Sequence, residues 1–100
     1  MLAQIEWLTE KEGGRLSPPS GPRYITVARF ADEKEKYPAE AWSLVLEFKA
    51  PSDDPQSMIA EVHFLANDAP TYLLYNGSLF ELFEGRKLVA RGRICKPPLK

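Results

Sequence analysis

The fold of this chain is decided near its end by the stretch Leu79-Phe80-Glu81-Leu82-Phe83-Glu84-Gly85-Arg86-Lys87-Leu88-Val89-Ala90-Arg91-Gly92. Two runs rich in aliphatic and aromatic residues flank a turn sequence, and the glycine in that turn permits the positive φ that tight hairpins need. We therefore expect strands over 79–84 and 88–95, joined as a β-hairpin.

Outward from this hairpin, four more segments read as strands, most of them with the alternation of apolar and polar side chains that is typical of half-buried strands. The six expected strands cover residues 2–8, 24–30, 42–49, 58–64, 79–84 and 88–95. Between the first two, Gly13-Gly14 and the proline-rich segment 17–22 interrupt regular structure, because proline has no amide donor. This pattern predicts an all-β sandwich or barrel, and closure into a barrel is favoured because it leaves no sheet edge exposed.

The chain has the length of one domain, 100 residues, and its 44% hydrophobic and 27% charged residues are typical of a soluble globular protein. We expect one barrel domain over residues 1–96 and a flexible tail over 97–100. The sequence holds neither an apolar run long enough for a membrane helix nor a signal-peptide pattern, which favours a cytoplasmic protein without membrane contact. Met1 favours a stand-alone chain over a fragment.

Residue types that carry catalysis or bind metals are scarce. Cys95 and His63 are the only residues of their kinds, and Asp53-Asp54 lies in a turn sequence where solvent keeps both carboxylates ionised. No Gly-x-x-x-x-Gly-Lys-Ser/Thr phosphate loop occurs in the sequence. We therefore expect no catalytic residues, no metal, no cofactor and no bound nucleotide, and so no enzyme.

Basic residues concentrate at the end of the chain, where residues 84–100 hold six of them against the single acid Glu84. At the two-residue period of a regular strand, Lys87, Arg91 and Arg93 share one face. Such a stripe can neutralise phosphates and makes RNA a candidate partner.

A second candidate surface is apolar. Leu79 and Phe83 lie on the opposite side of their strand from Phe80 and Leu82, so they face outward if the latter two fill a barrel. An exposed apolar pair beside arginines is typical of a protein interface. The alternative is that a neighbouring segment, such as residues 69–74, covers the pair.

Both ends of the sequence resemble a known domain. Four motifs are similar to those of the C-terminal barrel domain of elongation factor Tu: Thr9-Glu10-Lys11-Glu12-Gly13-Gly14-Arg15, Ser20-Gly21-Pro22-Arg23, Phe80-x-Leu82-x-Glu84-Gly85 and Val89-x-x-Gly92. The resemblance implies a six-stranded antiparallel closed β-barrel. In that family the barrel contacts the T-stem of aminoacyl-tRNA and the nucleotide exchange factor, and the matching positions here are Gly14, Arg15, Arg23, Glu84 and Gly85.

The chain departs from the family at Leu16, Ile25 and Phe83, which are apolar where the family has His, Gln and Arg. These changes favour a protein partner, so we expect a non-catalytic, stand-alone barrel that acts as a protein-interaction module, with a partner protein or as a homodimer. The alternatives are an RNA- or tRNA-binding module and, third, a barrel that binds a small ligand. The expected contact residues are Leu79 and Phe83 as an apolar patch, and Arg15, Arg23, Glu84, Gly85, Lys87, Arg91 and Arg93 for a partner or RNA.

Overall fold

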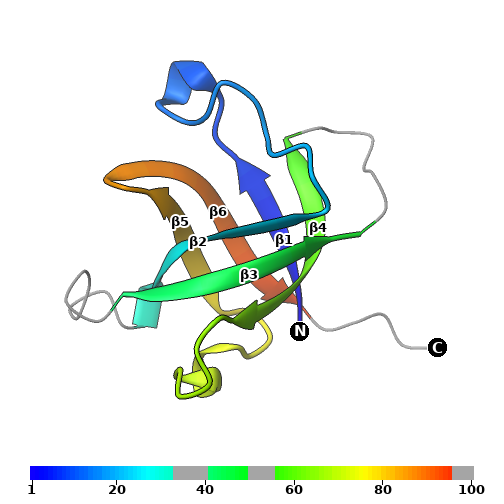
Figure 1. Cartoon of the computed structure of the whole chain (residues 1–100), viewed down its shortest axis with the longest axis vertical. Helices are drawn as coiled ribbons and strands as arrows, with labels where there is room; N and C mark the ends of the chain where they lie inside the picture. The colour runs from blue at the N-terminus through cyan, green and yellow to red at the C-terminus, as the bar shows by residue number, and fades with distance from the viewer. Residues whose placement is uncertain (33–40, 50–55, 96–100) are drawn as a thin grey trace.

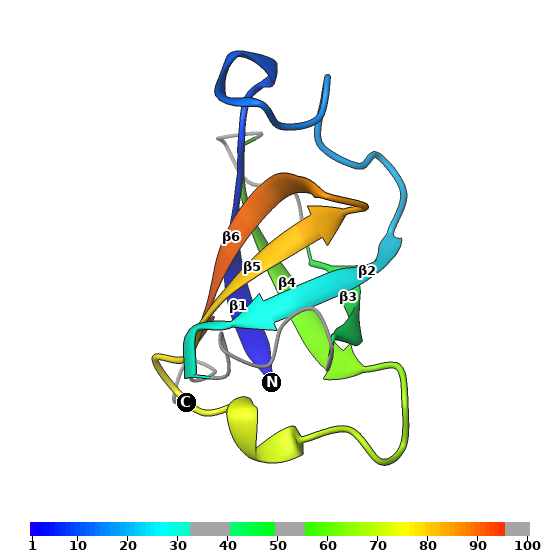
Figure 2. The same cartoon turned by 90° about the vertical axis from the view of Figure 1, so that its left-hand side faces the viewer.

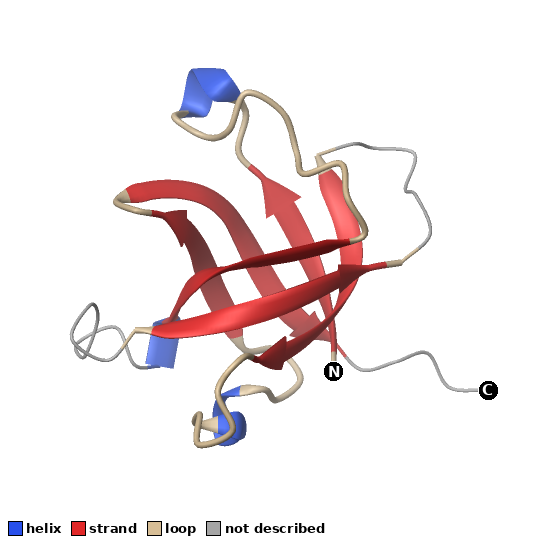
Figure 3. Ribbon diagram, in the orientation of Figure 1, coloured by secondary structure: helices blue, strands red, loops and turns tan. Residues whose placement is uncertain are grey.

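The computed structural model describes residues 1–32, 41–49 and 56–95. The expected tail over 97–100 and the Asp53-Asp54 turn lie outside these residues. Within them the chain is all-β (Figure 3), with short 3-10 turns that include Glu10–Glu12 and Thr71–Leu73, and no α-helix.

Six antiparallel strands close into a barrel in the order β1-β4-β3-β2-β5-β6, with β6 pairing back to β1 (Figure 1). Each begins and ends within one residue of its expected position, which confirms the predicted strands. The strands are β1 Leu2–Trp7, β2 Arg23–Phe30, β3 Trp42–Phe48, β4 Ser57–Phe64, β5 Leu79–Glu84 and β6 Lys87–Cys95. The expected closed antiparallel barrel is therefore the observed fold.

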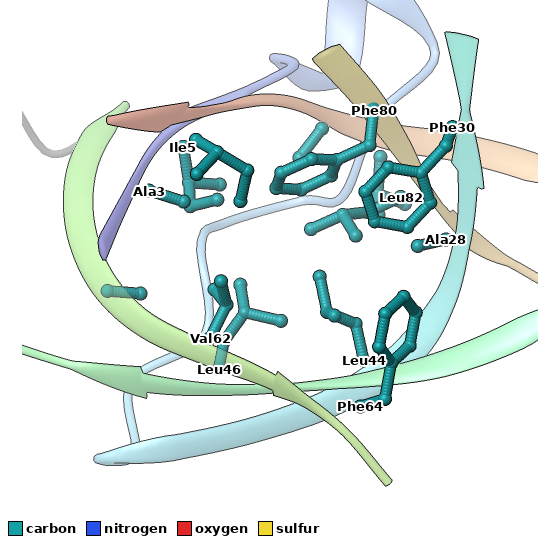
Figure 4. Close-up of a cluster of buried hydrophobic side chains, with 14 of the residues drawn as sticks. Ala3, Ile5, Ala28, Phe30, Leu44, Leu46, Val62, Phe64, Phe80 and Leu82 are labelled. Atoms are coloured by element: carbon teal, nitrogen blue, oxygen red, sulfur yellow. The ribbon is translucent and has the colours of Figure 1, made fainter. Parts of the chain in front are cut away.

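The barrel interior is filled by the apolar residues that alternate along the strands (Figure 4). The core includes Ala3, Ile5, Ala28, Phe30, Leu44, Leu46, Ala60, Val62, Phe80, Leu82 and Ile94. At one end of it, the Phe30 ring packs against Phe64 and Phe80 with centroid distances of 5.6 Å and 5.3 Å. Because side chains occupy this space, functional contacts belong to the outer surface and the barrel ends.

Gly92 of the quoted hairpin has a packing role. It is the cross-strand partner of Phe80, and a Cβ built on it would lie 2.3 Å from two atoms of the Phe80 ring. The ring therefore lies directly against the glycine backbone. A side chain at position 92 would displace the Phe80 ring from its place in the core.

A β-bulge interrupts the same hairpin. Leu82 pairs with Ala90 but the next residue, Phe83, pairs with Leu88, so Val89 is the extra residue of β6. Both Val89 and Ala90 consequently pack into the core. The alternation of faces along β6 is thus not the same before and after the bulge.

The first connection begins with a capped turn. The Thr9 side chain and the Glu12 side chain bond each other's backbone amides, and Gly13 ends the turn with φ of 90°. Gly14 passes so close to Leu8, the residue after β1, that a Cβ would lie 2.3 Å from the Leu8 carbonyl oxygen. The two glycines therefore serve different purposes: one supplies a left-handed conformation and the other a close approach of two backbone segments.

Candidate interaction surface

Arg15, Tyr24 and Glu84 form a cluster that we call the Glu84 cluster. Arg15 Nη1 and the Tyr24 hydroxyl both donate hydrogen bonds to Glu84 Oε2, and Arg15 Nε donates to the Ser17 carbonyl at 2.9 Å. The guanidinium also lies 5.6 Å from the centre of the Tyr24 ring, which packs edge-on against Trp7. The cluster joins the first connection to β2 and to the end of β5.

The electrostatics of the Glu84 cluster follow from these bonds. Partial burial acts to raise the pKa of Glu84, but the hydrogen bonds from Tyr24 and Arg15, together with the positive charges of Arg15 and Lys87, hold it below its usual value. Burial, followed by the bond to Glu84, raises the pKa of Tyr24 to about 12. At neutral pH the carboxylate is therefore charged, the phenol is neutral, and the charge of Arg15 is matched within the molecule.

This arrangement bears on several of the expected contact residues. Arg15 and Glu84 are brought together, and each has the other as its partner. Gly85 forms the β5–β6 turn with φ of 63°. Arg23 is exposed and its Nε lies 4.0 Å from a Glu47 carboxylate oxygen, a weak surface ion pair.

The expectation that Lys87 shares a face with Arg91 and Arg93 is wrong, because of the bulge at Val89. Arg91 pairs with Glu81, on the outer face of the hairpin, whereas Lys87 pairs with Glu84. Glu84 lies an odd number of residues after Glu81, so the two side chains, and with them their cross-strand partners, are on opposite faces. Arg91 and Arg93 both remain exposed on the outer face. The basic stripe therefore has two members.

The expectation of an exposed Leu79–Phe83 pair is also wrong, in its second member. Leu79 is 54% exposed, but Phe83 is only 8% exposed although it lies on the same outer face. The guanidinium of Arg29 lies 5.1 Å from the centre of the Phe83 ring, and Arg29 Nε donates to Glu81 at 2.8 Å. Arg29 is a cover that the sequence did not reveal, since it comes from a strand about fifty residues away.

The surface around Leu79 is hollowed. A groove of about 310 Å³ on the outer side of β1, β6 and β5 is lined by Gln4, Glu6, Leu79, Arg91, Gly92 and Arg93. A second hollow of about 230 Å³ shares Leu79, Arg91 and Gly92 with it and reaches Ala31, Phe80 and Glu81. We call the two together the Leu79 groove; Figure 2 shows β5 and β6, which carry most of it, side by side.

The charges along the Leu79 groove are unequal. Arg91 lies in register between Glu6 of β1 and Glu81 of β5, so it has a carboxylate neighbour on either side. Arg93 lies in register between Gln4 and Leu79, both uncharged. Among the described residues, no carboxylate comes within ion-pair distance of Arg93.

Comparison with known proteins gives no match to any family model, curated protein or solved structure. Over residues 1–32, 41–49 and 56–95, no three His, Cys, Asp or Glu side chains converge as metal ligands would. The same residues contain no helix with the length and apolar character to span a membrane. His63 is exposed, and Cys95 is half-buried at the end of β6.

Proposed function

We propose that this barrel is a non-catalytic protein-interaction module and that the Leu79 groove is its contact surface. The observation that carries the proposal is an apolar side chain, Leu79, left 54% exposed in a hollow that arginines border. Arginine is enriched in protein interfaces, and an apolar anchor surrounded by polar groups is their usual composition. The remaining apolar residue expected here, Phe83, is buried and contributes stability instead.

The distribution of charge favours protein over RNA as the partner. Arg91 and Arg93 on one face are suited to phosphates, but Glu6 and Glu81 flank the first of them and would repel a nucleic-acid backbone. Arg15, the arginine of the glycine loop, is engaged by Glu84. RNA binding is therefore the second candidate, and it rests on the arginine pair alone.

Site-specific photocrosslinking tests the proposal. A benzoylphenylalanine residue replaces Leu79 in one variant and, as a control, Leu65 in another; Leu65 is 55% exposed and follows β4, which lies three places from β5 in the barrel order. Irradiation in the native cell should give a discrete protein adduct at position 79 and none at position 65. Equal adducts at both positions, or none at 79, would refute the proposal, and an adduct removed by ribonuclease would support the RNA function in its place.

Light scattering on the purified chain identifies one kind of partner. A dimer whose subunits crosslink through position 79 would make the partner a second copy of the chain. A monomer that crosslinks only in the cell would make it a different protein.

A further inference from the structure

We infer that the Leu79 groove binds an extended segment of a partner protein that carries a carboxylate and, two residues away, a large apolar side chain. The inference rests on the proposed function and adds the chemistry of the ligand. It is carried by three features of the groove: the charge of Arg93, the apolar hollow beside it and the spacing between the two.

The first feature is the charge of Arg93, which no carboxylate in residues 1–32, 41–49 and 56–95 matches. Across the outer surface the charged residues Arg29, Glu81, Arg91 and Glu6 alternate in sign from strand to strand, so the row is balanced. The next row along β6 holds Arg93 between two uncharged neighbours. A guanidinium presents a planar set of donors that matches a carboxylate in bidentate geometry. The groove therefore offers one site for an anion.

The second feature is the apolar hollow. Beside Leu79, the hollow is lined by Ala31, Phe80 and Gly92. A large apolar side chain placed there would remove its own surface and that of Leu79 from water, and such burial is favourable by about 25 cal/mol for each Å² of apolar surface.

The third feature is the spacing. Leu79 and Arg93 are directly opposed on β5 and β6, and such pairs have Cβ atoms roughly 5 Å apart. In an extended peptide, residues i and i+2 point to the same side and lie roughly 6.6 Å apart. A Glu-x-Leu segment that crosses the hairpin can therefore place its carboxylate over Arg93 and its apolar side chain beside Leu79, whereas adjacent residues would point to opposite sides.

The test is a titration of the ¹⁵N-labelled protein with three capped peptides, whose blocked ends carry no charge. The probes are acetyl-Gly-Ser-Glu-Ser-Leu-Ser-Gly-amide, the same peptide with Lys for Glu, and the same peptide with Ala for Leu. We expect the first to bind with a Kd of about 1 mM and to shift the amides of Leu79 and residues 91–93, and the other two to bind at least about tenfold more weakly. Equal binding of the Lys peptide, shifts elsewhere on the barrel or no shifts at all would overturn the inference.

Two charge-reversal variants make the assignment specific. Arg93→Glu should weaken the Glu-x-Leu peptide at least about tenfold, while Arg86→Glu, an equal charge change in the turn at the other end of the hairpin, should leave it within about twofold. Amide spectra of both variants confirm that the fold is kept. Equal effects of the two variants would overturn the inference in favour of a general charge effect.

Failure of the inference and failure of the proposed function remain distinguishable. If crosslinking at position 79 persists unchanged in Arg93→Glu, the protein-interaction function is supported but the inferred acidic ligand is refuted. Self-association of the chain lost in Arg93→Glu, or binding of an oligouridine probe with the same amide shifts, would replace the inferred ligand by a second copy or by RNA. Absence of crosslinking at position 79 would remove the proposed function itself.

Discussion

Replacing Gly92 by alanine should destabilise the barrel through the Phe80 ring. The new Cβ would lie 2.3 Å from two ring carbons, against an ordinary carbon–carbon contact of roughly 3.5–4.0 Å. The ring is 2% exposed and packs on Phe30 at 5.3 Å, so it cannot turn aside without moving a second buried aromatic side chain. Overpacking of a core costs about 1–3 kcal/mol, and so large an overlap belongs at the upper end.

Urea denaturation followed by tryptophan fluorescence measures the effect. We expect Gly92→Ala to lower the free energy of unfolding by about 2–3 kcal/mol, a large part of the roughly 5–15 kcal/mol available to a domain. Gly21→Ala is the matched control, because its Cβ would meet nothing closer than 3.9 Å. It should change stability by less than about 0.5 kcal/mol.

A compensating variant isolates the cause. Phe80→Leu shortens the side chain that opposes Gly92, so adding Gly92→Ala to it should cost at least about 1 kcal/mol less than adding the same change to the wild type. If Gly92→Ala behaves like the Gly21→Ala control, or if its cost is unchanged in the Phe80→Leu background, the contact does not hold and the reasoning fails.

Three further predictions follow from the same structure. Glu84→Gln should lower the free energy of unfolding by about 0.5–1 kcal/mol at pH 7. Because the pKa of Glu84 is lowered in the folded state, the carboxylate stabilises the fold above its usual pKa, and this stabilisation is lost as the pH falls below that value. Urea titrations at pH 7 and pH 3 should therefore show that acid reduces the free energy of unfolding more in the wild type than in the variant. In thermal unfolding, Gly14→Ala should lower stability more than Gly13→Ala, because the new Cβ at position 14 would collide with a backbone oxygen whereas position 13 has only an unfavourable φ. The reverse order would contradict a close backbone approach at Gly14. Phe83→Ala should cost about 2–4 kcal/mol and Leu79→Ala less than about 0.5 kcal/mol in the same assay, and similar losses would mean that Phe83 is not covered.

The sequence by itself determined where the strands lie. The alternation of apolar and polar side chains and the turn residues are local properties, and they placed all six strands within one residue of their observed ends. They also identified the β5–β6 turn at Gly85 and the break at Gly13. Closure was a physical expectation from the need to hide sheet edges, and the observed pairing of β1 with β6 confirms it.

The candidate site was determined less completely. The sequence identified Leu79, Arg91 and Arg93 as outward-facing residues of the hairpin, and the structure places all three on one groove. It did not reveal the bulge, because three apolar residues in a row, Leu88-Val89-Ala90, do not indicate whether one of them is extra or which one it is. One inserted residue was enough to move Lys87 off the arginine face.

Only the tertiary structure decided the contacts between residues that are distant in the chain. Arg15 meets Glu84 across sixty-nine positions, and Arg29 covers Phe83 from a strand that is not adjacent in sequence. A local pattern states which side of a strand a residue occupies, but the strand order decides which side chains share that surface. Closure into this order placed Arg93 between the uncharged Gln4 and Leu79, with no carboxylate of the described residues in ion-pair range, and left Leu79 exposed, and so made the groove.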